Sequence, residues 1–182
     1  MKKSNEHRKL VKVDLVMLAL LAFLVFSDVK VIHVEGNSMF PTLEDNTITI
    51  GVGVHNIKRN DIVVAEHPTL GYIVKRVIGT EGDHVVISEK GTYVNDELLS
   101  DLGSSVFIDT IVPAGSVYLV GDNRDNSVDS RTFGAVEKTR ISTRLLTTKT
   151  ISTFKYRMLQ TFLVLLVLAY CIGLLEKDKE DN

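Results

Sequence analysis

Residues 71–78 read Gly-Tyr-Ile-Val-Lys-Arg-Val-Ile, a short run rich in β-branched and aromatic side chains. Such a run predicts a β-strand. Side chains alternate between the two faces of a strand, so Ile73, Lys75 and Val77 share a face, and a charge lies among aliphatic side chains. Burial of that face would lower the pKa of the lysine and let its amine accept a proton from a hydroxyl group. The alternative is an edge strand on which the lysine reaches solvent.

Five other runs have the same character, being short, rich in β-branched residues and bounded by Gly, Asn, Asp or Pro. They are residues 31–35, 47–53, 61–65, 84–88 and 117–120. Turn signals at 81–83 and 94–97 predict hairpin turns, whereas 99–113 has few signals and is expected to be a loop or lid. These features predict an all-β domain, either an antiparallel barrel or a sandwich.

The N-terminal end of the chain has the features of a membrane anchor. Residues 1–12 are basic and lead into an apolar run, and the small-residue pattern that a cleavage site requires does not follow it. We therefore expect a cytoplasmic basic segment at 1–12 and an uncleaved transmembrane anchor at 13–30. The domain at 31–157 would then lie on the extracytoplasmic side of the cell membrane.

A second run, 158–175, is apolar on all faces and predicts a second transmembrane helix. Basic residues precede it and the tail at 176–182 is acidic, which is the reverse of the usual charge bias. A buried or interfacial helix is therefore the alternative. Because the first helix usually dominates orientation, we expect both ends of the chain in the cytoplasm.

The composition argues against some kinds of partner and cofactor. The net charge of −2 argues against nucleic acid as a partner, because phosphate binding requires a basic excess. Cys171 is the single cysteine among 182 residues, so no disulfide framework can form within the chain. The sequence implies neither a metal nor an organic cofactor.

Residues 35–43 form a segment that is unusual for a purely structural domain. They read Glu-Gly-Asn-Ser-Met-Phe-Pro-Thr-Leu, in which Gly36 allows unusual backbone angles and Pro41 fixes the chain just beyond Ser38. Such a loop can expose Ser38 with its backbone N–H directed into a cleft, as half of an oxyanion hole. An ordinary turn is the alternative.

Residues 121–134 form a second unusual segment, Gly-Asp-Asn-Arg-Asp-Asn-Ser-Val-Asp-Ser-Arg-Thr-Phe-Gly. Two arginines among three aspartates predict a polar loop that pairs internally. A calcium-binding loop fits poorly, because Arg124 and Ser127 stand where such a loop needs an oxygen ligand and a glycine.

The chain resembles the type I signal peptidases, in their bacterial Ser/Lys branch. The resemblance is carried by segments that occur in the order found in that family: residues 36–43, 59–65, 74–83 and 121–134. It implies that Ser38 is the nucleophile and Lys75 the general base. Ser127 matches a serine that hydrogen-bonds and orients the lysine. Asp129 and Arg131 match an ion pair that holds the geometry of the site.

The resemblance also implies a membrane-associated all-β catalytic domain without a cofactor. Its partners would be secretory preproteins and membrane lipid. Small side chains before the cleaved bond would enter shallow apolar pockets. We expect these pockets to be lined by Val34, Met39, Leu43, Ile73 and Val74.

Two departures from the family leave the Ser–Lys pair untouched. Gly36 stands where some members carry a serine that completes the oxyanion hole. The segment between Lys75 and Gly121 is too short for the large second domain of some members. A histidine base is the alternative to the lysine, but the four histidines that lie in or beside the predicted strands are expected to be surface residues. They are His33, His55, His67 and His84.

Two other functions stay open at this stage. One is a non-catalytic relative that helps to assemble surface structures, and retention of both Ser38 and Lys75 argues against it. The other is a self-cleaving repressor-type Ser/Lys protein. The anchor, together with the lack of a DNA-binding helix pair in the sequence, argues against that function.

Overall fold

The computed structural model describes residues 28–54, 56–149, 151–152 and 155–163. The basic segment at 1–12, the anchor up to residue 27, and the second apolar run and tail from residue 164 lie outside these ranges. Residues 155–163 are helical. Among the described residues, no helix is long and apolar enough to cross a membrane.

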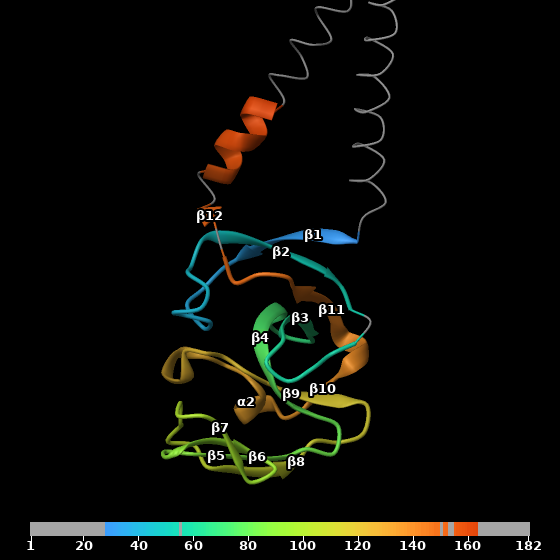
Figure 1. Cartoon of the computed structure of the whole chain (residues 1–182), viewed down its shortest axis with the longest axis vertical. Coiled ribbons are helices and arrows are strands. Elements are labelled where there is room, and N and C mark those ends of the chain that lie inside the picture. Colours follow the sequence, from blue (N-terminus) through green and yellow to red (C-terminus); the bar gives the residue numbers. More distant parts are fainter. Residues whose placement is uncertain (1–27, 55, 150, 153–154, 164–182) are drawn as a thin grey trace, which may run out of the picture.

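The described part of the chain is built mainly from a large antiparallel sheet of eight strands (Figure 1). Its order is β1-β2-β11-β3-β4-β9-β10, with β12 paired to β2. The strands are β1 (Val29–Val34), β2 (Thr47–Gly53), β3 (Ile62–His67), β4 (Gly71–Thr80), β9 (Ser116–Val120), β10 (Val136–Glu137), β11 (Ile141–Leu145) and β12 (Ile151–Ser152).

A second antiparallel sheet of four strands lies at the end of the domain opposite β1 and β12 (Figure 1). Its order is β7-β6-β5-β8. The strands are β5 (His84–Ser88), β6 (Gly91–Val94), β7 (Glu97–Ser100) and β8 (Ile108–Ile111). Three short helices complete the elements: η1 (Arg124–Asn126), α2 (Ser130–Phe133) and η2 (Lys138–Arg140).

The prediction of an all-β antiparallel domain is confirmed, and all six predicted strands are present. The turn at 94–97 is a β-hairpin turn, with Asn95 and Asp96 at positive φ. The turn at 81–83 instead carries the chain from the large sheet to the small one, because β4 and β5 belong to different sheets. The prediction of a loop over 99–113 is wrong at 99–100, which end β7, and at 108–111, which form β8 and pair with β5. The sheet also begins at Val29, so residues 29–30 belong to β1 and not to an anchor.

Three apolar clusters hold these elements together. The cluster between the sheets joins Ile78 and Tyr118 of the large sheet to Val85 and Ile87 of the small one. Another lies directly beneath residues 35–43 and includes Val34, Met39, Leu43, Ile62, Val64 and Leu145. Met39 and Leu43 are almost completely buried in this cluster. The segment that carries Ser38 is therefore anchored to the core on its C-terminal side.

Candidate active site

Ser38 is presented by a sharp turn after β1. Gly36 has a φ of 85°, a backbone conformation that side chains disfavour, and its N–H donates to Asp45 Oδ1 at 2.7 Å. Met39, which directly follows Ser38, is buried, whereas Ser38 itself is half-buried. The turn thus holds the serine hydroxyl at the boundary between core and solvent.

Lys75 lies in the middle of β4 and contacts that hydroxyl directly. Its side chain is only 4% exposed, and Nζ lies 2.7 Å from Ser38 Oγ and 3.1 Å from the carbonyl oxygen of Val74. Ile73 and Val77, which share its face of the strand, pack in an apolar cluster. The alternative of a lysine that reaches solvent is therefore wrong.

The surroundings of Lys75 favour a neutral amine. Burial lowers the pKa of Lys75 from its ordinary value, and the negative charge of Asp129 opposes the shift without cancelling it. A neutral lysine amine has a free lone pair and can accept the proton of a serine hydroxyl. The pair thus has the geometry and the electrostatics of a nucleophile and its base.

Asp129 and Arg131 form the predicted ion pair, and it is buried. Asp129 Oδ1 accepts from Arg131 Nε at 2.8 Å, and Oδ2 accepts from Arg131 Nη2 at 2.9 Å. The two side chains are 0% and 7% exposed. Asp129 also accepts the N–H of Gly121 at 2.9 Å and caps α2. Burial alone would raise the pKa of Asp129, but the hydrogen bonds from Arg131 and Gly121 outweigh it and hold the pKa below its ordinary value.

Ser127 lies next to the pair but does not make the expected contact with the lysine. Among the described residues, its buried Oγ makes no hydrogen bond that meets the usual geometric limits. It faces Gly121, at the place where a Cβ on that glycine would lie. Ser127 thus lies near the Ser–Lys pair, as the resemblance implies, but it makes no hydrogen bond to Lys75.

A second, half-buried ion pair supports the site and is not among the predicted contacts. Arg76 Nε and Nη2 donate to the two carboxylate oxygens of Asp122 at 2.7 and 2.6 Å, and Thr42 Oγ1 donates to the same carboxylate at 2.5 Å. These contacts join the serine loop, β4 and the loop after β9. The signal was present in the sequence, since Arg76 follows Lys75 and Asp122 follows Gly121 in the two quoted motifs.

The backbone of the serine loop is also held by the loop after β9. The N–H of Asn123 donates to the carbonyl of Ser38 at 3.0 Å, and its side-chain amide donates to the carbonyl of Asn37 at 3.0 Å. No hydrogen bond takes up the N–H of Ser38 within the described part of the chain. This donor is therefore available to a ligand beside the hydroxyl.

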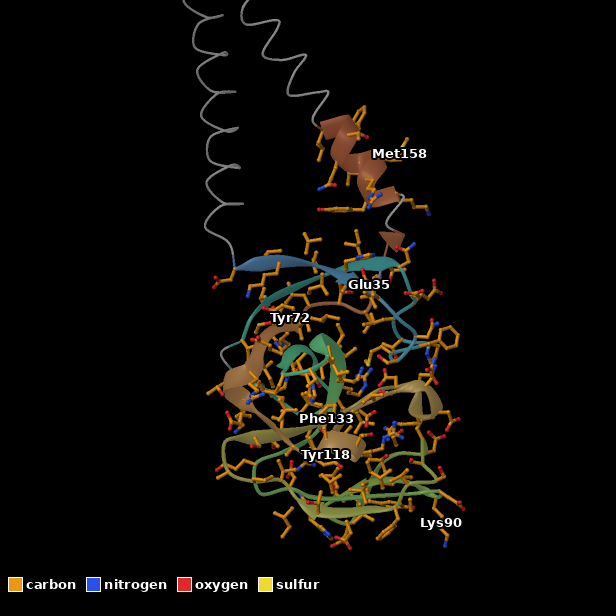
Figure 2. All side chains as sticks on the ribbon, turned by 180° about the vertical axis from the view of Figure 1, so that it is seen from behind. Glu35, Tyr72, Lys90, Tyr118, Phe133 and Met158 are labelled. Atoms are coloured by element: carbon orange, nitrogen blue, oxygen red, sulfur yellow. The ribbon has the colours of Figure 1, made fainter. Side chains whose placement is uncertain are left out.

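A cleft of about 350 Å³ lies beside the pair. Four of the five predicted lining residues contribute to it: Val34, Met39, Ile73 and Val74. The fifth prediction, Leu43, is wrong, because its side chain is 0% exposed and packs in the core beneath the loop. Tyr72 and Glu35 also line the cleft, and Figure 2 shows both at the end of the domain away from Lys90.

Gly121 offers a direct test of how closely the loops pack. A Cβ at this position would lie 2.6 Å from the carbonyl oxygen of Ser38 and 2.6 Å from Ser127 Cβ. Backbone cannot move aside without shifting the nucleophile, and a displacement of about 1 Å can cost about 10²-fold in rate. We expect Gly121→Ala to lower kcat by about 10²-fold. The control is Gly53→Ala, where the new methyl group would lie no closer than 4.0 Å to its nearest neighbour, Asp28. Equal activity of the two variants would contradict this packing.

The chain matches a family model described as signal peptidase, peptidase S26, over residues 7–148. It is 33% identical to mitochondrial inner membrane protease subunit 1 of Homo sapiens over 112 residues, 58% of this chain and 60% of that protein. It is 31% identical to signal peptidase I U of Bacillus subtilis over 153 residues, 72% of this chain and 81% of that protein.

A crystal structure of a signal peptidase I from Enterococcus faecalis aligns with 50% of this chain and 98% of its own, at 26% identity and a TM-score of 0.46. The extent of the family match, 142 of 182 residues from 7 to 148, shows that the chain belongs to the peptidase S26 family of signal peptidases. The chain spans about 60% of the length of its mitochondrial relative.

Proposed function

We propose that this protein is a membrane-bound serine endopeptidase that removes N-terminal signal peptides from exported preproteins. The observation that carries the proposal is the 2.7 Å contact between Lys75 Nζ and Ser38 Oγ, made by a buried lysine at an apolar cleft. Membership of the signal peptidase family supports the kind of substrate.

In the proposed reaction, neutral Lys75 accepts the proton of Ser38 as Oγ attacks the carbonyl carbon of the cleaved peptide bond. The tetrahedral intermediate collapses, the C–N bond breaks, and the leaving amine takes the proton back from Lys75. The signal peptide is then held as an ester on Ser38. Lys75 next accepts a proton from water, the hydroxide attacks the ester, and the serine leaves with that proton.

The oxyanion of each intermediate needs hydrogen-bond donors that are already in place. The N–H of Ser38 supplies one, because the described part of the chain leaves it without an acceptor. Gly36 provides no hydroxyl as a second donor. In this proposal the second donor is therefore a backbone N–H or water, and Ser38 N–H carries a larger share of the stabilisation.

The proposed location is the cell membrane, with the catalytic domain on the extracytoplasmic side. The beginning of β1 and the helix at 155–163 lie at the same end of the domain in Figure 1, so both predicted apolar segments would leave it in the same direction. A span at each end would hold the cleft near the membrane surface. Processing by a protein from which residues 158–182 are deleted should persist, because no proposed site residue lies beyond Arg131.

The direct test is to incubate the purified full-length chain in detergent with a panel of exported preproteins. We expect cleavage after small residues, as the resemblance to the signal peptidases implies for the cleft beside Ser38. Replacing the residue before the cut by phenylalanine should abolish processing of the same preprotein. If no preprotein in the panel is shortened, the proposed function is wrong.

The pH dependence follows from the state of Lys75. Because the base has a lowered pKa, kcat/KM should rise with pH through a midpoint below the ordinary lysine value of 10.5.

The lowered pKa of Lys75 also affects stability. Between the lowered and the ordinary pKa, the unfolded chain binds more protons than the folded one, so the free energy of unfolding rises with pH across that interval. Lys75→Met should lack this rise. Denaturant unfolding of both proteins between pH 7 and 10 measures this difference. If the free energy of unfolding changed with pH by the same slope in both proteins, Lys75 would not have the lowered pKa that its role as the base requires.

A further inference from the structure

Glu35 is the acidic side chain that lines the cleft, and it is open to solvent. The carboxylate side chain is 81% exposed, and it lies three residues before Ser38 at the end of β1. Basic side chains line the same cleft at His33 and Lys75. Burial lowers the pKa of Lys75 and so favours its neutral form.

Contacts on both sides of Glu35 hold it at the rim. His33 Nδ1 lies 3.2 Å from the carboxylate, and His33 Nε2 lies 3.2 Å from Asn46 Oδ1, so the imidazole bridges β1 to the following loop. The turn at Gly36 is fixed by its hydrogen bond to Asp45. Glu44 and Asp45 are two more exposed acidic residues on this loop, and Asp45 lies next to Gly36 through that hydrogen bond.

An aromatic residue of the same cleft offers a surface that suits a cation. Tyr72 on β4 lines the cleft and is 71% exposed. An aromatic face attracts lysine and arginine side chains, whose long aliphatic stems also pack on apolar surface. Ile73 and Val74, both half-buried, supply such apolar surface in the same cleft.

We propose that Glu35 is a specificity-determining residue that selects preproteins with a lysine or arginine close to the cleaved bond. The inference rests on the proposed function and narrows its substrate class. Glu35 does not touch the reacting atoms, so it acts on the ranking of substrates and not on the chemical step. An exposed charge pair is a weak interaction. A lysine substrate is attracted to Glu35 and a glutamate substrate is repelled, so the two effects together give a ratio of roughly tenfold between their kcat/KM values.

The experiment uses the full-length chain in detergent and one preprotein that it cleaves. Single lysine, glutamine or glutamate substitutions are placed in turn at each position within three residues of the cut, excluding the small residues required for processing. At one position or more, we expect the lysine substrate to be preferred over the glutamate substrate by roughly tenfold in kcat/KM. The preference should shrink in about 0.5 M salt, because salt screens exposed charges.

Three variants test whether Glu35 causes the preference for the lysine substrate over the glutamate substrate. Glu35→Gln should bring the lysine-to-glutamate ratio close to one, and Glu35→Lys should invert it, each ratio being measured against the glutamine substrate with the same variant. Glu89→Gln, an exposed carboxylate on the small sheet, should leave the ratio unchanged. A wild type without preference, or a preference that survives Glu35→Lys, would overturn the inference alone. Failure of the wild type to cleave any preprotein would overturn the proposed function as well.

Discussion

Ser38→Ala and Lys75→Ala are each expected to reduce preprotein cleavage by about 10³-fold or more, because each removes one member of a pair that acts as a unit. The hydroxyl and the amine are in direct contact at 2.7 Å, so neither can be replaced by a neighbouring group without moving the loop or the strand. Cleavage is measured on one preprotein at fixed pH. Ser105→Ala and Lys90→Ala, both exposed in loops that join strands of the small sheet, serve as controls.

Lys75→Arg separates the chemical role of the lysine from its charge. Arginine keeps a cation in the strand but cannot be deprotonated in a protein, so it cannot serve as the base. This variant is expected to be as inactive as Lys75→Ala. Near-native cleavage by Lys75→Ala with an intact fold would show that the base lies elsewhere, and His33 at the cleft would be the next candidate.

Asp129→Ala is expected to lower the free energy of unfolding by about 3–5 kcal/mol, because it leaves the buried guanidinium of Arg131 without its partner. It also removes the acceptor of the Gly121 N–H, next to Ser38. Stability and activity should therefore fall together, as measured by denaturant unfolding and by cleavage. The stabilising effect of the ionised carboxylate is present above the ordinary aspartate pKa and is lost as the pH falls through the lowered pKa.

Asp109→Ala is the matched control, since Asp109 pairs with His84 at 2.7 Å on the surface, with 56% of its side chain exposed. Exposed pairs contribute about 1 kcal/mol or less. An Asp129→Ala protein that is inactive but fully stable would assign Asp129 a direct part in the chemistry.

The strands that carry the site could be predicted because each has a strong local pattern. The run at 71–78 alternates aliphatic side chains around one lysine, and the structure extends it only to Thr80. The Ser–Lys contact could not be derived from alternation alone. It depends on a loop and a strand 37 residues apart in the sequence, and the family resemblance supplied that pairing.

The errors have physical reasons of their own. Residues 108–111 alternate between half-buried and exposed, so β8 gains its stability from pairing with β5 and not from a strong pattern. Leu43 was placed by its nearness to Ser38 in sequence, but the turn at 36–40 directs it into the core. The strand at 141–145 is not predicted, although buried and half-buried positions alternate there, because polar side chains occupy three of the five positions.

The most direct test of a Ser38 nucleophile is to trap the acyl-enzyme. Wild type is mixed with a preprotein, quenched with acid during turnover, digested and measured by mass spectrometry. Acid preserves the ester and stops its hydrolysis by removing the neutral form of Lys75. We expect the peptide that carries Ser38 to gain the mass of the signal peptide fragment minus water, and the adduct to be absent from Ser38→Ala. Turnover that continues without any adduct on that peptide, or an adduct that persists in Ser38→Ala, would contradict Ser38 as the nucleophile.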